Sequence, residues 1–163
     1  MVNRRLTISF DVDAVLAGFT ELLYHRGLIP KDHVITEWGD PYIRTIYPLL
    51  LHNERFWLSL PVIDTIPEGV TPTCYLTSRE IPMHWTEAWL LSMGFPCAPV
   101  VVTEDKAKMM QLLDIDVHID DSASHFKEII DSGKTCLLYD RTWNQEVKTD
   151  LRIKKLSEII NHI

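Results

Sequence analysis

The sequence has 163 residues, enough for one domain that buries about 70% of the surface exposed by its unfolded chain. The net charge of −7, without a basic stripe, argues against a nucleic-acid polymer or an anionic membrane as partner. No apolar run approaches the roughly 20 residues that span a bilayer. The three cysteines lack metal-binding or redox spacing and lie in or beside apolar segments, so we expect buried, reduced thiols in a cytoplasmic protein.

The first predicted strand, residues 6–10, is a β-branched and apolar run that ends at two aspartates, Asp11 and Asp13. Such a run is typical of a buried parallel strand. Apolar residues then recur at helical spacing over 15–23, and Gly27 supplies a stop, so we expect a helix here. Carboxylates at the carboxyl end of a parallel strand lie where open α/β folds bind their ligands.

The segment from about residue 31 to residue 72 departs from this pattern. It is rich in aromatic residues and prolines, and it contains no convincing strand. We expect short helices near 32–37, 41–51 and 53–59. The segment therefore predicts a small helical insert rather than a continuation of the sheet.

The alternation of strands and helices returns at residue 73. Further strands are expected at 73–76, 99–102, 116–119 and 135–139, with a closing amphipathic helix at 150–161. Strands that alternate with helices of this length imply a parallel sheet with right-handed crossovers. The sequence thus predicts an α/β fold with a parallel five-stranded sheet flanked by helices. We expect a single domain, 1–163, whose core comprises 1–30 and 73–163.

Polar residues follow three of the predicted strands. They are Asp11 and Asp13, then Thr77 and Ser78, then Asp120 and Asp121. Because parallel strands all point the same way, these residues should converge on one edge of the sheet. Carboxylates from two strands would repel one another without a cation, and hard oxygen ligands suit Mg²⁺. Lys106, just after the third predicted strand, is placed to hold phosphate oxygens together with the hydroxyl groups.

Each of these elements also has a simpler interpretation when taken alone. A lone pair of aspartates at this spacing is usually solvated, and Asp120 and Asp121 could be favoured by the dipole of the following helix. Thr77 and Ser78 could cap a turn, and Lys106 could lie on an exposed helix face. The order in which all four elements occur favours a single site.

The segments FDVDAVLAG, YLTSR and HIDD, with Lys106 between the last two, resemble the four motifs of the haloacid dehalogenase (HAD) superfamily. The resemblance covers nearly the whole chain and implies a Rossmann-like HAD fold. The insert 31–72 falls where that superfamily places a helical cap. Three further features resemble the 5′(3′)-deoxyribonucleotidase group: the run from Asp11 to Phe19, the Phe56-Trp57 segment, and YDRTWN after the fifth predicted strand.

The resemblance implies a Mg²⁺-dependent phosphomonoester hydrolase that acts through an aspartyl-phosphate. Asp11 would be the nucleophile and Asp13 the acid–base. The implied metal ligands are Asp11, Asp13 through its backbone carbonyl, and Asp120 and Asp121, without a decision as to which of the last two binds directly. The implied phosphate-binding residues are Thr77, Ser78 and Lys106.

The implied substrate is a small phosphorylated molecule, in this group a nucleoside monophosphate. The implied substrate-binding residues are Phe19, Trp38, Phe56, Trp57 and Arg79. The aromatic rings would stack on a nucleobase or, alternatively, form the small core of the insert.

Two departures from the group bear on these expectations. Ala14 stands where glycine is common in similar phosphatases, and Ser122 stands where the deoxyribonucleotidases tend to have arginine. Two other functions stay open at this point. One is a HAD phosphatase for another small phosphorylated metabolite, and the other is a HAD-fold protein that binds without turnover.

Overall fold

The computed structural model describes residues 6–163, so residues 1–5 of the expected core lie outside the described part. A six-stranded parallel sheet has the order β3-β2-β1-β4-β5-β6. The strands are β1 (Ile8–Phe10), β2 (Cys74–Thr77), β3 (Val100–Val102), β4 (Val117–Asp120), β5 (Thr135–Tyr139) and β6 (Arg152–Ile153). The predicted α/β class is confirmed, and all five predicted strands form.

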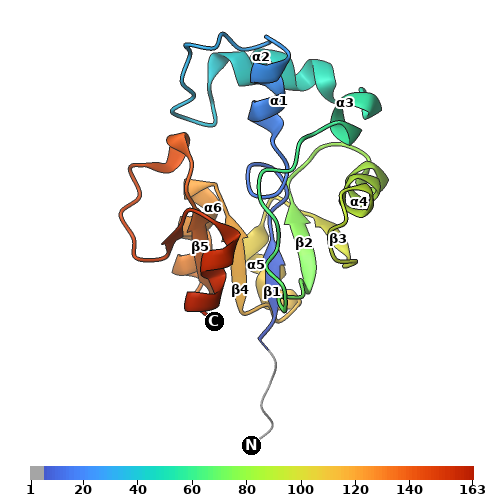
Figure 1. The fold of residues 1–163 in the computed structure, drawn as a ribbon. Helices are drawn as coiled ribbons and strands as arrows, with labels where there is room; N and C mark the ends of the chain where they lie inside the picture. Colours follow the sequence, from blue (N-terminus) through green and yellow to red (C-terminus); the bar gives the residue numbers. More distant parts are fainter. Residues whose placement is uncertain (1–5) are drawn as a thin grey trace, which may run out of the picture.

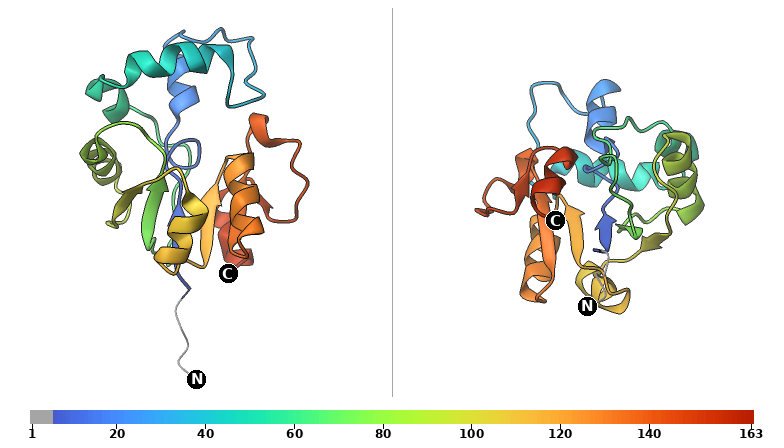
Figure 2. Two further views of the ribbon diagram at one scale, coloured as in Figure 1. Left: turned by 180° about the vertical axis from the view of Figure 1, so that it is seen from behind. Right: turned by 60° about the horizontal axis from the view of Figure 1, so that its bottom comes forward.

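Helices cover both faces of the sheet (Figures 1 and 2). They are α1 (Phe19–His25), α2 (Pro41–Leu50), α3 (Glu54–Leu58), α4 (Met83–Ser92), α5 (Lys106–Leu112) and α6 (Ala123–Asp131), with 3₁₀ helices η1 (Thr142–Asn144) and η2 (Leu156–Asn161). Met110 and Phe126 pack α5 and α6 on one face of the sheet. Trp89 and Leu156 pack α4 and η2 on the opposite face.

The helix predicted over 15–23 forms only from Phe19 onwards, as α1. The chain between β1 and α1 is a compact loop instead. The backbone N–H of Ala17 donates to the carbonyl of Val12, and α1 begins only at Phe19. Ala14 has φ = +61°, a left-handed conformation that costs a non-glycine residue roughly 1–2 kcal/mol. Val15 and Leu16 are fully buried, so their spacing serves packing of the loop rather than a helix face.

Residues 31–72 carry α2 and α3, which lie with α1 beyond the carboxyl ends of the strands (Figure 1). Helices were predicted near 41–51 and 53–59, and both form. The helix predicted at 32–37 is wrong, because this segment is extended and fixed by side-chain contacts. The hydroxyl of Tyr24 donates to the backbone carbonyl of His33. The imidazole Nε2 of His33 lies 2.7 Å from a carboxylate oxygen of Asp40.

The predicted closing helix at 150–161 is also wrong. Residues 152–153 instead form β6, the sixth strand, which pairs with β5, and only a 3₁₀ helix follows. Arg152 donates to the carbonyls of Asn144 and Val147 from one guanidinium nitrogen, and Ile153 is fully buried against the sheet. These contacts hold the backbone extended where the amphipathic pattern had indicated a helix.

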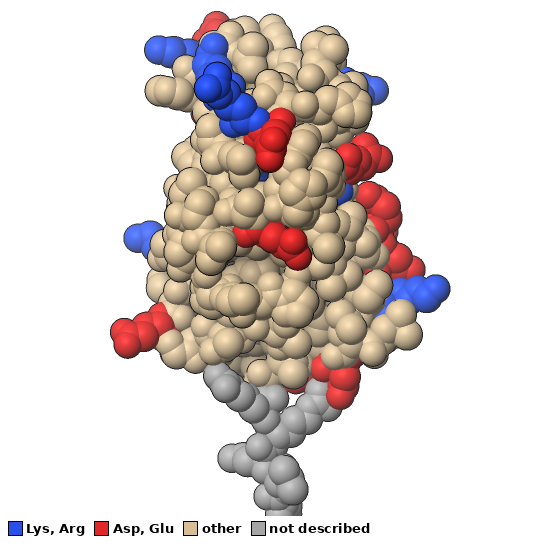
Figure 3. All heavy atoms as spheres, turned by 90° about the vertical axis from the view of Figure 1, so that its right-hand side faces the viewer, with Lys and Arg blue, Asp and Glu red and all other residues tan. Residues whose placement is uncertain are grey.

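In Figure 3 acidic side chains form a row along the right-hand edge of the face, and further acidic side chains lie near its middle. All three cysteines are free; Cys74 and Cys136 are buried as expected, whereas Cys97 is exposed and corrects that prediction. Among the described residues, no helix has the length and apolar character needed to cross a membrane.

Gly18 lies where the loop after β1 packs closely against the chain beyond α3. A Cβ atom at Gly18 would lie 2.9 Å from a methyl group of Ile63 and 3.0 Å from Cβ of Glu21. We expect Gly18→Ala to lower the free energy of unfolding by about 1–3 kcal/mol through overpacking. Gly39→Ala is the matched control, because a Cβ at Gly39 would meet nothing within 4 Å. Urea unfolding measures the free energy of unfolding of both variants. Equal values for Gly18→Ala and Gly39→Ala would contradict this packing.

Candidate active site

The three neighbouring strands at the centre of the sheet bring the predicted site residues to one edge. Asp11 directly follows β1, Thr77 is the last residue of β2, and Asp120 is the last residue of β4. β1 pairs with both β2 and β4. The backbone N–H of Asp11 donates to the carbonyl of Ile119 at 2.9 Å, which sets Asp11 beside Asp120.

Lys106 connects two of these carboxylates. It is the first residue of α5, and its side chain is 1% exposed. Its Nζ lies 2.7 Å from Oδ2 of Asp120 and 3.1 Å from Oδ2 of Asp11. Burial opposes the charge, but the two carboxylates raise the pKa of Lys106 above its ordinary value. Lys106 is therefore a permanent buried cation at the floor of the site.

Asp11, Asp120 and Asp121 form a buried acidic cluster in which one oxygen of each lies within 4.8 Å of the others. Burial, aided by the charges of Asp120 and Asp13, raises the pKa of Asp11 to about 7 against the opposing effect of Lys106. Burial and the neighbouring carboxylates also raise the pKa of Asp121 well above 3.8. One lysine does not balance three carboxylates. Hard oxygen donors with excess negative charge fit a divalent cation such as Mg²⁺.

The two adjacent aspartates have different environments. Asp120 accepts from Lys106 and from Nε2 of His118 at 3.0 Å on Oδ2, and from the backbone N–H of Ser122 at 2.8 Å on Oδ1. Burial alone would raise the pKa of Asp120, but Lys106 and His118 together lower it well below 3.8. Asp121 accepts from the indole N–H of Trp143 on Oδ2, and among the described residues no donor reaches its Oδ1. Asp121 thus has the freer oxygen for a cation.

His118, on β4, is fully buried. Its Nδ1 lies 2.8 Å from the hydroxyl of Ser9, so the ring connects β1 to Asp120. Burial lowers the pKa of His118. The sequence signal for this contact is the spacing of two between His118 and Asp120, which puts both on one face of β4. His125, on α6, lies near the same carboxylate, with its Nδ1 3.4 Å from Oδ2 of Asp120.

Asp13 is held by Arg79 in a two-pronged ion pair. Nε of Arg79 donates to Oδ2 of Asp13, and Nη2 donates to Oδ1, both at 2.8 Å. Arg79 is 2% exposed; its Nη1 donates to Thr86, and its guanidinium lies over the ring of Trp57. The sequence implied a substrate contact for Arg79, but in this structure its guanidinium is occupied by Asp13.

A cavity of about 730 Å³ lies directly over the acidic cluster, within the size range of small-molecule sites. Its lining includes Asp11, Asp13, Thr77, Ser78 and Asp121 on the side of the sheet. On the side of the insert it includes Trp38, Ile43, Arg44, Tyr47 and Pro48. The cavity therefore combines a polar floor with a largely apolar wall whose charged residues are Arg44 and Glu37.

The predicted substrate-binding aromatics divide into two groups. Trp38 lines the cavity and is 45% exposed. Phe19, Phe56 and Trp57 are buried and lie outside the lining, with the rings of Phe19 and Trp57 stacked at 5.5 Å and Phe56 set edge-on to both. The structure does not bring these three rings to the cavity, because they form the core between α1 and α3. Tyr47, another aromatic residue of the insert, lines the cavity together with Trp38.

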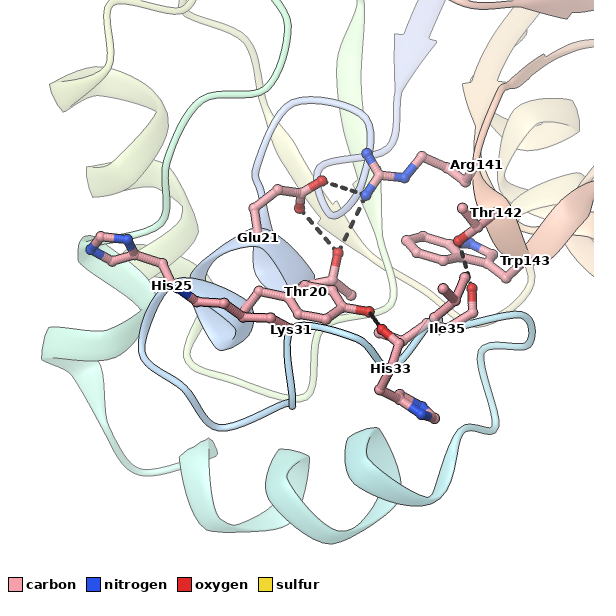
Figure 4. A pocket seen from close by; sticks show the side chains of 11 residues that line it. Thr20, Glu21, His25, Lys31, His33, Ile35, Arg141, Thr142 and Trp143 are labelled. Atoms are coloured by element: carbon pink, nitrogen blue, oxygen red, sulfur yellow. Dashed lines mark hydrogen bonds and ion pairs between the residues drawn. The ribbon is translucent and has the colours of Figure 1, made fainter.

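A second cavity of about 560 Å³ lies between α1, the segment 31–35 and η1 (Figure 4). Its charged groups are largely paired within the chain, since Arg141 bridges to Glu21 and His33 contacts Asp40. Trp143 lines both cavities. Asp11, Asp13, Thr77, Ser78 and Asp121 line the first cavity, and none of them lines the second. The second cavity lies where the insert meets α1 and η1.

Comparison with known proteins yields a structural similarity but no family or curated match. No family model matches the sequence, and no curated protein matches it. Among solved structures, the chain is similar to a HAD-superfamily hydrolase from Ehrlichia chaffeensis, with 12% sequence identity and a TM-score of 0.46. The likeness covers 96% of this chain and 94% of that chain. At this identity and TM-score it supports no conclusion about activity.

The raised pKa of Asp11 predicts how the stability of the metal-free protein depends on pH. A carboxyl whose pKa rises from 3.8 to about 7 on folding stabilises the fold fully below 3.8, and this stabilisation is lost as pH rises towards 7. In a chelator, the free energy of unfolding of the parent should therefore fall relative to that of Asp11→Asn between about pH 4 and 7. Denaturant titrations across this range measure the difference. The exposed Asp131→Asn variant should show no such trend, and a constant difference between parent and Asp11→Asn would contradict the shift.

Proposed function

We propose that this chain is a HAD-type, Mg²⁺-dependent phosphomonoester hydrolase that acts through an aspartyl-phosphate on Asp11. One observation carries the proposal: residues of all four motif-like segments lie at a single cavity. Asp11, Thr77 and Asp121 line it, and Lys106 lies directly beneath, in contact with Asp11. A domain with a core of 1–30 and 73–163 and a helical cap of about 31–72 is part of this proposal, as is a cytoplasmic location.

In the first step, a carboxylate oxygen of Asp11 attacks the phosphorus atom, and the bond from phosphorus to the ester oxygen breaks. Asp13 gives its proton to the departing alcohol oxygen. Thr77 and Ser78 donate hydrogen bonds to the phosphoryl oxygens from their side of the cavity. Lys106 holds the second oxygen of Asp11 in place, so that the attacking carboxylate is oriented before the substrate arrives.

In the second step, Asp13 takes a proton from a water molecule as that water attacks the phosphorus of the aspartyl-phosphate. The bond between phosphorus and the Asp11 oxygen breaks, which releases inorganic phosphate and restores both carboxyls. The fork of Arg79 fixes the plane of the Asp13 carboxyl. Each oxygen of Asp13 retains a further lone pair for proton transfer.

The residues fit Mg²⁺ as the cofactor. The Asp11 side chain, the Asp13 backbone carbonyl and the Asp121 side chain would hold it, while Asp120 is engaged mainly with Lys106 and His118. Bound there, Mg²⁺ supplies positive charge that offsets the negative charge developing on the phosphoryl oxygens.

We further propose a nucleoside monophosphate as the substrate. The support is the apolar wall of the cavity, where the exposed ring of Trp38 and the ring of Tyr47 offer faces to a flat base. Arg44 is the one arginine on this wall, so little positive charge is available there for a second phosphate group. The second candidate is a phosphatase for another small phosphorylated metabolite, favoured by the absence from the cavity lining of Phe19, Phe56 and Trp57.

Replacement of the proposed nucleophile tests the reaction class. Asp11→Asn should lower the hydrolysis of p-nitrophenyl phosphate by at least about 10³-fold, because the amide cannot form the covalent intermediate. The activity of the parent should require Mg²⁺ and disappear in a chelator. Phosphate release is the measurement, with Asp131→Asn as a control that removes one exposed charge and keeps the rate of the parent.

A parent protein that hydrolyses no phosphoester in the presence of Mg²⁺ would overturn the proposal and favour a HAD-fold protein that binds without turnover. Full activity in Asp11→Asn would likewise exclude Asp11 as the nucleophile.

A substrate panel tests the nucleotide. Deoxynucleoside 5′- and 3′-monophosphates should give a higher kcat/KM than sugar phosphates, because only the former place a ring against the apolar wall. Trp38→Ala should reduce this preference by about 5- to 150-fold, since base–aromatic stacking contributes roughly 1–3 kcal/mol. Sugar phosphates that react equally well or better would exclude the nucleotidase and leave the second candidate.

A further inference from the structure

Residues 141–144 connect the acidic cluster to both α1 and the insert. In this segment, Arg141 donates to Glu21 and Thr20 on α1, and Thr142 donates to the carbonyl of Ile35 (Figure 4). The side-chain amide of Asn144 donates to the carbonyls of Asp121 and Tyr139, each at 2.8 Å. The segment is thus fixed at both ends, and Trp143 lies between these anchors.

Among the described residues, the carboxylate of Asp121 accepts one side-chain hydrogen bond, and the indole of Trp143 donates it. Its Nε1 donates to Oδ2 at 2.7 Å, and the side chain is 7% exposed. The guanidinium of Arg141 lies 4.7 Å from the centre of the Trp143 ring, and the ring of Trp38 lies 5.6 Å away. These contacts restrict the indole to one orientation, so the carboxylate it holds is restricted as well.

A fixed Oδ2 determines where Oδ1 points. Asp121 lines the cavity, and its Oδ1 receives no donor from the described residues. One oxygen of Asp121 lies within 4.8 Å of an oxygen of Asp11 and of Asp120, so a rotation of the carboxylate would change the geometry of the cluster. Groups that orient a ligand in this way typically change metal affinity by 10–100-fold when they are removed.

We propose that Trp143 is a positioning residue that orients Asp121 for a divalent cation, by holding one carboxylate oxygen so that the other faces the acidic cluster. This rests on the metal site of the proposed function. It goes beyond that function by assigning a role to a residue that touches neither the phosphate nor the cation.

The test is cation affinity, measured without substrate. Trp143→Phe keeps an aromatic ring beside Arg141 and Trp38 but removes the N–H donor. Its dissociation constant for Mn²⁺, followed by electron paramagnetic resonance of the free ion, should exceed that of the parent by 10–100-fold. Trp89→Phe is the matched control, because it also removes one buried indole hydrogen bond, at 2.9 Å to the carbonyl of Leu60, remote from the cluster. Its Mn²⁺ affinity should equal that of the parent.

A second measurement uses the unaltered chain and so does not depend on the folding of any variant. With ¹⁵N-labelled tryptophan, Mg²⁺ should shift the indole N–H resonance of Trp143, while that of Trp89 stays in place. The indole resonances are assigned from through-bond and nuclear Overhauser spectra of the unaltered chain. An unshifted Trp143 resonance at saturating Mg²⁺ would overturn the proposal, as would equal Mn²⁺ affinity in Trp143→Phe and the parent, or a parent that binds no divalent cation.

The outcome separates this inference from the proposed function. A parent that binds Mn²⁺ with an affinity that falls in Trp143→Phe, but that hydrolyses no phosphoester, would retain the positioning role and reject the enzyme. A parent that hydrolyses phosphoesters with Mg²⁺, and whose Trp143→Phe variant binds Mn²⁺ equally well, would retain the enzyme and reject the positioning role.

Discussion

The buried ion pairs of Lys106 determine much of the arrangement at the carboxyl edge of the sheet. A lysine with 1% of its side chain exposed must be neutralised, and Asp11 and Asp120 do this from two adjacent strands. Removal of one partner of such a pair typically costs roughly 3–5 kcal/mol, because a charge is left buried and alone. Asp120 is therefore drawn towards the lysine, and Asp121 is left with a free oxygen. The division of labour between two neighbouring aspartates follows from this one charge.

The fold and the floor of the site were largely predictable, since they depend on regular patterns. Buried parallel strands read as short apolar runs, and their shared direction brings the residues that follow them to one edge. Asp11, Thr77 and Asp120 lie together for this reason. The failures are local. The apolar spacing over 15–23 suited a helix, but backbone hydrogen bonds and a left-handed Ala14 turn residues 11–18 into a loop.

Side-chain partners across the chain were beyond the reach of the sequence. Phe19, Phe56 and Trp57 carry the same chemistry as Trp38, and only packing decides which rings form a core and which line a cavity. The pairing of Arg79 with Asp13 joins residues 66 positions apart, and that of Trp143 with Asp121 joins residues 22 apart. Neither has a periodic signature. Polar residues near strand ends identify a site, but their partners depend on tertiary structure.

The contact of Arg79 with Trp57 bears on how such a protein can diversify. Arg79 joins the carboxyl of Asp13, the proposed acid–base, to the ring of Trp57, which stacks on Phe19. A change of Trp57 or Phe19 would therefore alter the support of the Asp13 carboxyl. Trp38 and Tyr47 line the cavity, but their rings also pack against Phe19, and the charge of Asp13 contributes to the raised pKa of Tyr47. Under the proposed function, a change of substrate preference at these two positions would therefore also act on the buried rings that support Asp13.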